Sequence, residues 1–262
     1  MKHLILLATL SLSAAATADP GVQQVLACMR ANQPPSLSIQ RVELTATDRT
    51  GASRTLQGRL MLMREKTAGG DALSRAVLRV DQPDYLAGAS YLVRESRDHS
   101  SDEMYVYLPS VGRVRRVSGS LANGSLLGTN FSYYDFKQMQ TAFGAANSVL
   151  SAAGELGQRQ VYVLTLTAAP AEGSPYSSIR AWVDQKTCVP LQAEFYEGKT
   201  VRKRLVTKPT DLYQAGSYWY PAATDMTDLG DGTHTVLRIL GASGSNELPG
   251  RYFDPQMFYQ AN

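Results

Sequence analysis

A long succession of strand-length segments separated by tight turns constrains this chain more than any other feature of its sequence. Many of the turns carry Gly, Asp, Asn or Pro, as at Thr50-Gly51, Glu197-Gly198 and Asp231-Gly232. Such turns join consecutive strands into antiparallel hairpins. The segments predicted as strands are 37–47, 56–65, 75–80, 89–95, 104–108, 113–117, 149–156, 160–167, 179–184, 191–197, 201–207, 218–228 and 233–240. We therefore expect a mainly β protein with one strongly curved antiparallel sheet or incomplete β-barrel.

Two helical segments are expected beside the sheet. Apolar residues between Val22 and Met29 recur at helical spacing, and Asn32-Gln33-Pro34-Pro35 ends that segment. A second helix is predicted over 131–140, where aromatic residues fall three apart and Thr129 or Asn130 provides the cap. Both helices are expected to cover the concave face of the sheet.

Several strands are apolar on both faces. Leu60 and Leu62 point one way, and Met61 and Met63 point the other; residues 161–164 repeat this pattern. A single-layer sheet needs only one apolar face, so the second face requires a cover, another sheet or a ligand. Methionine and aromatic side chains either complete the core there or surround a flexible acyl chain.

Residues 102–136 combine strand, turn and loop signals. Tyr105-x-Tyr107-Leu-Pro ends one strand, and Gly112-Arg-x-Arg-Arg forms a turn and a second, cationic strand. Residues 118–128 are rich in Ser, Gly and Leu and are predicted as a packed, irregular loop. Gly128-Thr-Asn-Phe-Ser-Tyr-x-Asp-Phe then leads into the second helix.

These motifs resemble the periplasmic outer-membrane lipoprotein-sorting-like proteins of the LolA-like group. The segment Tyr176-Ser-Ser-Ile-Arg-Ala-Trp-Val-Asp, followed by Pro190-Leu191, Glu194-Phe-Tyr and Gly198-Lys199, matches them in the same order. The resemblance covers most of the chain after residue 35. It implies a concave apolar surface that holds acyl chains while the molecule crosses an aqueous gap. Relatives of this type are often associated with inner-membrane transporters of the resistance-nodulation-division class.

The resemblance therefore implies a periplasmic carrier or chaperone for a lipid or a lipidated protein, and not an enzyme. Two alternatives stay open: an RseB-like sensor or adaptor that binds a membrane regulator, and a ligand-free accessory protein that docks on a transporter. An RseB-like protein carries a second small domain, for which about 244 mature residues are too short. We expect a monomer.

The beginning of the chain has the pattern of a secretory signal peptide. A short basic start precedes an apolar run from Leu4 to Ala15, and Ala16-Thr-Ala18 forms a small-x-small cleavage signal. The apolar run is shorter than the ~20 residues that span a bilayer. We expect cleavage after residue 18, export to the periplasm, and a single domain over residues 19–262.

The mature chain retains two cysteines, Cys28 and Cys188. In an oxidising compartment a lone pair either forms a bridge or remains as two buried thiols, and the export signal favours the bridge. A metal site is a poor alternative, since no His lies near either thiol in the sequence. The predicted bridge ties the first helix to a late strand.

The charge of the chain gives no sign of a nucleic-acid partner. The formal net charge is +3, and +2 once Lys2 leaves with the signal peptide. Two basic clusters stand out, Arg113, Arg115 and Arg116, and the run 202–204. Such clusters are often solvated strand edges, and contact with anionic headgroups or an acidic partner surface is the functional alternative.

The sequence carries no recognisable catalytic or metal-binding motif. His99 and His234 do not have a metal-ligand spacing, and Gly241-Ala-Ser-Gly does not complete a nucleophile elbow. Gly198-Lys-Thr lacks the first glycine of a phosphate loop and is expected to be a hairpin turn. We expect no catalytic residues, no metal and no cofactor.

The predicted ligand site consists of an apolar cavity and a lid. The loop 118–128 either moves with the aromatic segment behind it to admit acyl chains, or completes the core as a static plug. The residues predicted for the cavity and lid are Met61, Met63, Tyr105, Tyr107, Leu121, Leu126, Leu127, Phe131, Tyr134, Phe136 and Trp182.

Overall fold

The computed structural model describes residues 21–70, 72–97, 101–143, 147–167, 173–245 and 249–260. The predicted signal peptide and His99 lie outside these residues. Thirteen strands form one antiparallel sheet in the order β6-β5-β4-β3-β2-β1-β15-β14-β11-β10-β9-β8-β7, and β12 and β13 form a separate hairpin. The order has two ends, so the sheet is not closed. The predicted mainly β fold with an incomplete barrel is confirmed.

The elements follow the sequence prediction closely. The α-helices are α1 (Val22–Ala31) and α2 (Tyr133–Gln140). The strands are β1 (Ser38–Thr47), β2 (Ser53–Lys66), β3 (Ala72–Gln82), β4 (Ser90–Arg94), β5 (Glu103–Leu108), β6 (Arg113–Arg116), β7 (Asn147–Leu156), β8 (Arg159–Thr167), β9 (Ser178–Asp184), β10 (Pro190–Glu197), β11 (Thr200–Val206), β12 (Leu212–Ala215), β13 (Tyr218–Pro221), β14 (Ala223–Asp228) and β15 (Thr233–Gly244). Short 3-10 helices are η1 (Asp84–Leu86), η2 (Gly119–Asn123), η4 (Pro209–Asp211), η5 (Pro249–Tyr252) and η6 (Phe258–Gln260). None of the helices in the described residues is long and apolar enough to cross a membrane.

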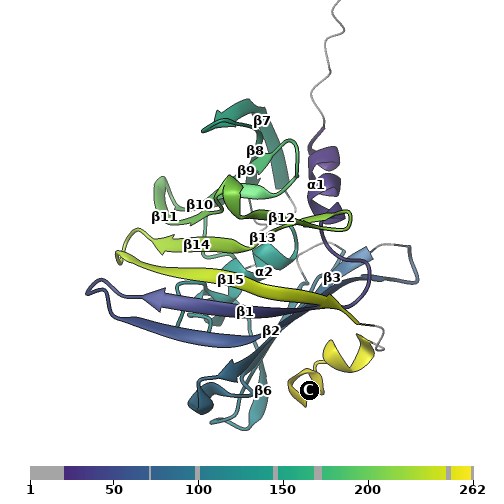
Figure 1. Cartoon of the computed structure of the whole chain (residues 1–262), viewed down its shortest axis with the longest axis vertical. Coiled ribbons are helices and arrows are strands. Elements are labelled where there is room, and N and C mark those ends of the chain that lie inside the picture. The colour runs from purple at the N-terminus through teal and green to yellow at the C-terminus, as the bar shows by residue number, and fades with distance from the viewer. Residues whose placement is uncertain are drawn as a thin grey trace, which may run out of the picture.

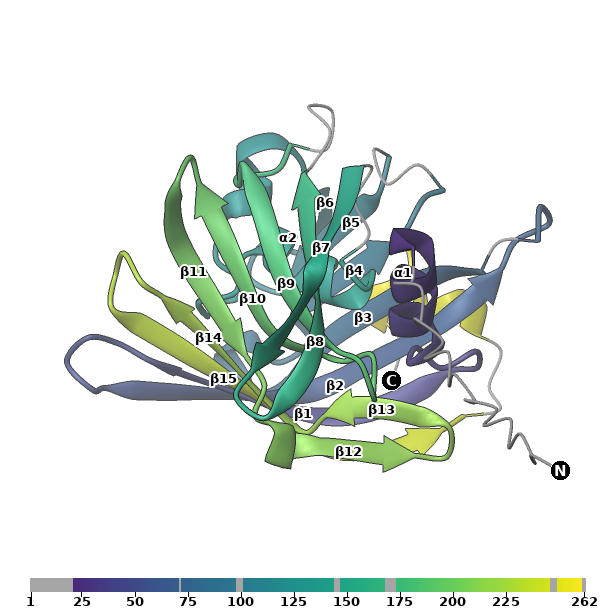
Figure 2. The same ribbon diagram turned by 90° about the horizontal axis from the view of Figure 1, so that it is seen from above.

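The sheet curls around α2 (Figures 1 and 2). Its register shifts at several bulges, among them Arg41/Val42 and Phe195/Tyr196, and bulges bend strands and increase their twist. A capping box fixes the start of α2: the Asp135 N–H donates to Ser132 Oγ, and the Ser132 N–H donates to Asp135 Oδ2. The helix therefore begins at Tyr133, two residues later than expected from Phe131.

The main core fills the concave face. Alternate residues of the strands pack there against α1, α2 and the loop between β6 and α2. The helices contribute Val25, Leu26, Met29, Tyr133, Tyr134 and Phe136, all buried. This explains one of the two apolar faces that the strand pattern predicted.

The C-terminal segment covers part of the convex face. Tyr252, Phe253 and Phe258 pack on Met61 and other residues of β2, β3 and β4 in a second buried cluster. The rings of Tyr107 and Tyr259 stack with centroids 4.1 Å apart in the same cluster. The second apolar face of this half of the sheet is thus covered by the chain itself.

The hairpin of β12 and β13 was not predicted. The sequence pattern indicated one strand over 218–228, but the chain instead leaves the hairpin at Pro221 and enters the main sheet at Ala223. Four-residue strands carry too little periodicity to be recognised. The aromatic run Tyr218-Trp219-Tyr220 behind the Gly216-Ser217 turn is the signal that marks this hairpin.

Candidate ligand-binding site

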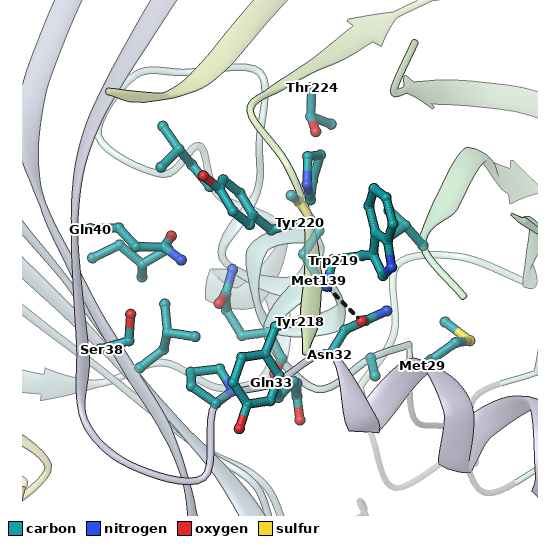
Figure 3. Close-up of a pocket in the computed structure, with 18 of the residues that line it drawn as sticks. Met29, Asn32, Gln33, Ser38, Gln40, Met139, Tyr218, Trp219, Tyr220 and Thr224 are labelled. Atoms are coloured by element: carbon teal, nitrogen blue, oxygen red, sulfur yellow. Dashed lines mark hydrogen bonds between the residues drawn. The ribbon is translucent and has the colours of Figure 1, made fainter. Parts of the chain in front are cut away.

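A pocket opens at one end of the concave face, between α1, the hairpin of β12 and β13, and the C-terminal end of α2 (Figure 3). Its volume is about 230 Å³, slightly below the roughly 300–1,000 Å³ typical of small-molecule sites. Apolar side chains dominate the lining, which includes Met29, Leu60, Leu62, Met139, Phe143, Leu205, Leu237 and Ile239. The pocket is therefore an unfilled extension of the main core.

The wall of the pocket includes strained backbone. Four non-glycine residues among those described have positive φ, and three of them line the pocket: Ala142 at 53°, Phe143 at 54° and Cys188 at 58°. Left-handed backbone costs an ordinary residue roughly 1–3 kcal/mol and persists only where the surroundings enforce it. Such positions concentrate at binding sites, so the strain adds to the case for this pocket.

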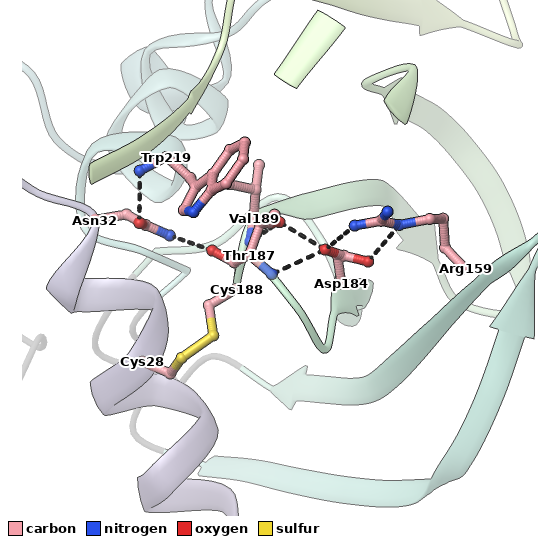
Figure 4. The surroundings of a disulfide bond; sticks show 8 residues. All are labelled: Cys28, Asn32, Arg159, Asp184, Thr187, Cys188, Val189 and Trp219. Atoms are coloured by element: carbon pink, nitrogen blue, oxygen red, sulfur yellow. Dashed lines mark hydrogen bonds and ion pairs between the residues drawn. A yellow bond between two sulfur atoms is a disulfide. The ribbon is translucent and has the colours of Figure 1, made fainter. Parts of the chain in front are cut away.

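Asn32 links the two sides of the pocket mouth (Figure 4). Its Oδ1 accepts the Trp219 N–H at 2.9 Å, and its Nδ2 donates to the Thr187 carbonyl oxygen at 2.7 Å. One amide at the end of α1 thus holds both the hairpin and the loop that carries Cys188. The sequence analysis treated Asn32 only as part of a helix-ending segment.

The predicted disulfide is confirmed. Cys28 of α1 and Cys188 are bonded, with their Cα atoms 5.7 Å apart. Next to it, Asp184 accepts from Arg159 Nε at 2.8 Å and from the Thr187 hydroxyl at 2.7 Å. Burial raises the pKa of Asp184, but these hydrogen bonds outweigh it and hold the pKa below its ordinary value. The loop at the mouth is therefore anchored to α1 and to β8.

The predicted cavity residues occupy several different places. Of the eleven, only Met63 lines this pocket, where it also packs against the convex cluster. Met61, Tyr105 and Tyr107 lie under or beside the C-terminal segment, and Trp182 packs with Val161 and Leu191 near β12. These four differ from the expectation because alternation shows that two residues lie on opposite faces but not which face is concave.

The predicted lid residues lie in the main core, away from the pocket lining. Leu126, Phe131, Tyr134 and Phe136 are buried, and Leu127 is partly buried against them. Leu121 differs, because it lies in η2 with 41% of its surface exposed. The structure describes the loop in a packed position, in which it fills the concave face around the start of α2.

Buried charge pairs fix α2 in that position. Lys137 Nζ lies 2.8 Å from Asp102 Oδ2, and Lys203 Nζ lies 2.7 Å from Asp135 Oδ2. The Tyr176 hydroxyl donates to Asp135 Oδ1 at 2.7 Å. Burial, together with the adjacent carboxylate, raises the pKa of Tyr176 far above its ordinary range, so this phenol remains a donor.

The two basic clusters have different surroundings. Arg113, Arg115 and Arg116 are exposed on β6, an edge strand, and no ion pair joins them to an acid among the described residues. The cluster on β11 is instead neutralised: Arg202 pairs with Asp228 and Asp231, Lys203 with Asp135, and Arg204 with Glu194. Within the described ranges, no group of three or more acidic, His or Cys side chains has the arrangement of a metal site.

Comparison with known proteins supports the fold. A family model described as "Uncharacterized protein" matches residues 72–259, and a search of curated proteins found no match. The solved structure of a DUF1329 family protein from Desulfovibrio piger is 21% identical, with a TM-score of 0.78 over 88% of this chain and 95% of that chain.

Two further solved structures share the architecture. A putative outer membrane lipoprotein-sorting protein domain from Vibrio parahaemolyticus is 23% identical, with a TM-score of 0.73 over 88% of this chain and 95% of that chain. A LolA superfamily protein from Nitrosomonas europaea is 19% identical, with a TM-score of 0.69 over 90% of this chain and 98% of that chain. The chain therefore belongs to the family of uncharacterized proteins whose model matches residues 72–259, and its fold is that of the lipoprotein-sorting, LolA-like proteins.

Proposed function

We propose that the protein is a periplasmic carrier or chaperone that holds an acyl chain of a lipid or lipidated protein in this pocket. The observation that carries the proposal is the apolar pocket itself, lined by leucine and methionine side chains on the concave side of a LolA-like sheet. Each methylene that leaves water contributes roughly 0.8 kcal/mol. The burial of many methylenes therefore stabilises a bound chain without any directional contact.

The size of the pocket implies movement at its mouth. At about 230 Å³ it accepts part of an acyl chain, and a longer chain requires the hairpin to shift outward. The hairpin is separate from the main sheet, and Tyr213 on β12 is 55% exposed. Its Trp219 N–H is held by a hydrogen bond to Asn32, and we propose that release of this bond lets β12 and β13 act as the movable side of the site.

We further propose that β6 contacts the partner. Its three exposed arginines present uncompensated positive charge that suits anionic headgroups or an acidic surface of a membrane transporter, such as one of the resistance-nodulation-division class. Replacing all three by Gln should weaken that contact, and should do so less at high salt, where the charges are already screened. A salt-independent loss would contradict an electrostatic role.

The carrier proposal is tested by extracting purified protein with organic solvent and analysing the extract by mass spectrometry, together with Nile red uptake by the delipidated protein. We expect a co-purifying acylated molecule and saturable uptake. Leu62→Asp places a charge in the pocket wall and should reduce uptake at least tenfold. Val149→Asp is the matched control, because Val149 is 64% exposed and lies on the edge strand β7. Consistently empty protein that takes up no dye would refute the proposal.

A further inference from the structure

The pocket wall is almost free of charge. Among the described residues that line it, Arg75 is the only one with a formally charged side chain. That guanidinium is already engaged: Nε donates to Glu65 Oε2 at 2.9 Å, and Nη1 donates to the carbonyl oxygens of Ser74 and Glu95. An anionic ligand would have to compete with Glu65 for it.

Gln40 supplies a neutral hydrogen-bonding group in the wall. It lies on β1 opposite Leu60 of β2 and Ala242 of β15, and all three residues line the pocket. Its side chain is half-buried and forms no hydrogen bond with another described residue. A carboxamide in this setting can donate to a carbonyl oxygen or accept from a hydroxyl.

The hairpin adds two phenols to the same pocket. Tyr218 and Tyr220 are half-buried on β13, and neither hydroxyl is hydrogen-bonded to another described residue. Figure 3 shows Gln40 and Tyr220 among the residues around one pocket. Gln40 and these two phenols thus add uncharged donors and acceptors to the wall from two elements, β1 and β13.

We infer that the pocket selects acyl chains joined to an uncharged polar group, such as an ester, an amide or a glycerol hydroxyl, over free fatty acids. The inference rests on the proposed function and specifies its ligand class. A carboxylate that moves from water into this pocket loses its hydration. The cation in the wall, Arg75, is already paired with Glu65 and does not compensate for that loss. An ester or amide carbonyl has far less hydration to lose and finds the Gln40 amide as a donor.

The first experiment compares laurate with monolaurin, its uncharged glycerol ester, as competitors for Nile red bound to the delipidated protein. At about pH 8 we expect monolaurin to bind at least tenfold more tightly. Near pH 5 the difference in affinity between monolaurin and laurate should become smaller. A carboxyl with an ordinary pKa of about 4–5 takes up a proton more readily in an apolar pocket. Monolaurin affinity should not change over this range.

The second experiment alters the wall. Gln40→Lys should raise laurate affinity about tenfold at pH 8 and shift monolaurin affinity less than threefold, because the new ammonium pairs with the carboxylate. Gln57→Lys is the control: Gln57 lies on β2, which pairs with β1, but it is exposed and does not line the pocket. It adds the same charge to the protein and should leave both affinities unchanged.

The outcomes separate the two proposals. If neither lipid displaces Nile red, the carrier proposal fails and this inference fails with it. If wild-type protein binds laurate as tightly as monolaurin at pH 8, the carrier proposal stands and the selectivity is wrong. The wild-type comparison decides this point even if Gln40→Lys does not fold. A folded Gln40→Lys variant with unchanged laurate affinity would overturn the assignment of Gln40.

Discussion

The two ends of α2 have opposite surroundings. At its N-terminal end, Lys203 and Tyr176 satisfy Asp135, and Phe131 is fully buried. At its C-terminal end, the helix meets strained backbone and a pocket in which the Gln40 side chain forms no hydrogen bond with another described residue. Fully satisfied polar networks rigidify a core, whereas unsatisfied groups beside a pocket are available to a ligand. The difference agrees with our proposal, in which the N-terminal end provides stability and the C-terminal end borders the ligand site.

The largest effect on stability should come from a change at the N-terminal end of α2. Phe131→Ala removes a fully buried ring and should lower the free energy of unfolding by about 3–5 kcal/mol. Monolaurin affinity of the folded variant should be unchanged, because Phe131 does not line the pocket. Chemical denaturation and dye displacement measure the two quantities. Little loss of stability with a clear change in lipid binding would instead support a lid formed by the loop 118–128.

The disulfide lies at the pocket end, where it ties α1 to the loop that carries Cys188, and its removal should affect both stability and binding. The double variant Cys28→Ser/Cys188→Ser should lose roughly 2–5 kcal/mol of stability, because the bridge closes a loop with a sequence separation of 160. Cys188 also lines the pocket, so lipid affinity should fall as well. Denaturation with and without reductant tests this, and unchanged binding in a destabilised variant would limit the bridge to a structural role.

Asn32 should affect the mouth more than the core. Asn32→Ala removes the bonds to Trp219 and Thr187 and should cost about 1–2 kcal/mol. Lipid release should accelerate several-fold, because the hairpin is less restrained. Asn32→Asp keeps an acceptor for the Trp219 N–H and should show a smaller change. Stopped-flow dye release distinguishes the variants, and equal rates in all three proteins would contradict a restraining role.

The smallest effect should be the contribution of Asp184 to stability at low pH. Because the folded-state pKa of Asp184 is below its ordinary value, its contribution is present above about pH 4 and is lost as pH falls through the folded-state pKa. Asp184→Asn should therefore be less stable at neutral pH and should lose less of its stability on acidification. Thermal melts between about pH 7 and pH 3 measure the slope. Parallel curves for wild type and variant would exclude Asp184 as a source of acid sensitivity.

Sequence patterns predicted the framework but not the position of the site. Most strands of the main sheet, both α-helices and the Cys28–Cys188 bridge follow from local periodicity, turn chemistry and the predicted compartment. The pocket depends on a hairpin of two four-residue strands, too short for a periodic signal. The faces of Met61 and Tyr105 depend on which remote segment covers them, and that contact with the C-terminal segment leaves no local pattern.

The order of the strands has a consequence for how the protein acquires its structure. Strands β1 to β6 pair in sequence, strands β7 to β11 do the same, and the β1–β15 ladder joins residues about 200 positions apart, such as Ser38 and Gly244. Ladders between distant residues form late, because closing the intervening chain costs entropy first. Two partly formed sheets with unpaired edges should therefore exist before the β1–β15 ladder forms. Pulse-labelled hydrogen exchange would detect late protection of the amides that pair β1 with β15. Until then each edge can add a foreign strand, so aggregation during folding should depend on how fast the β1–β15 ladder forms.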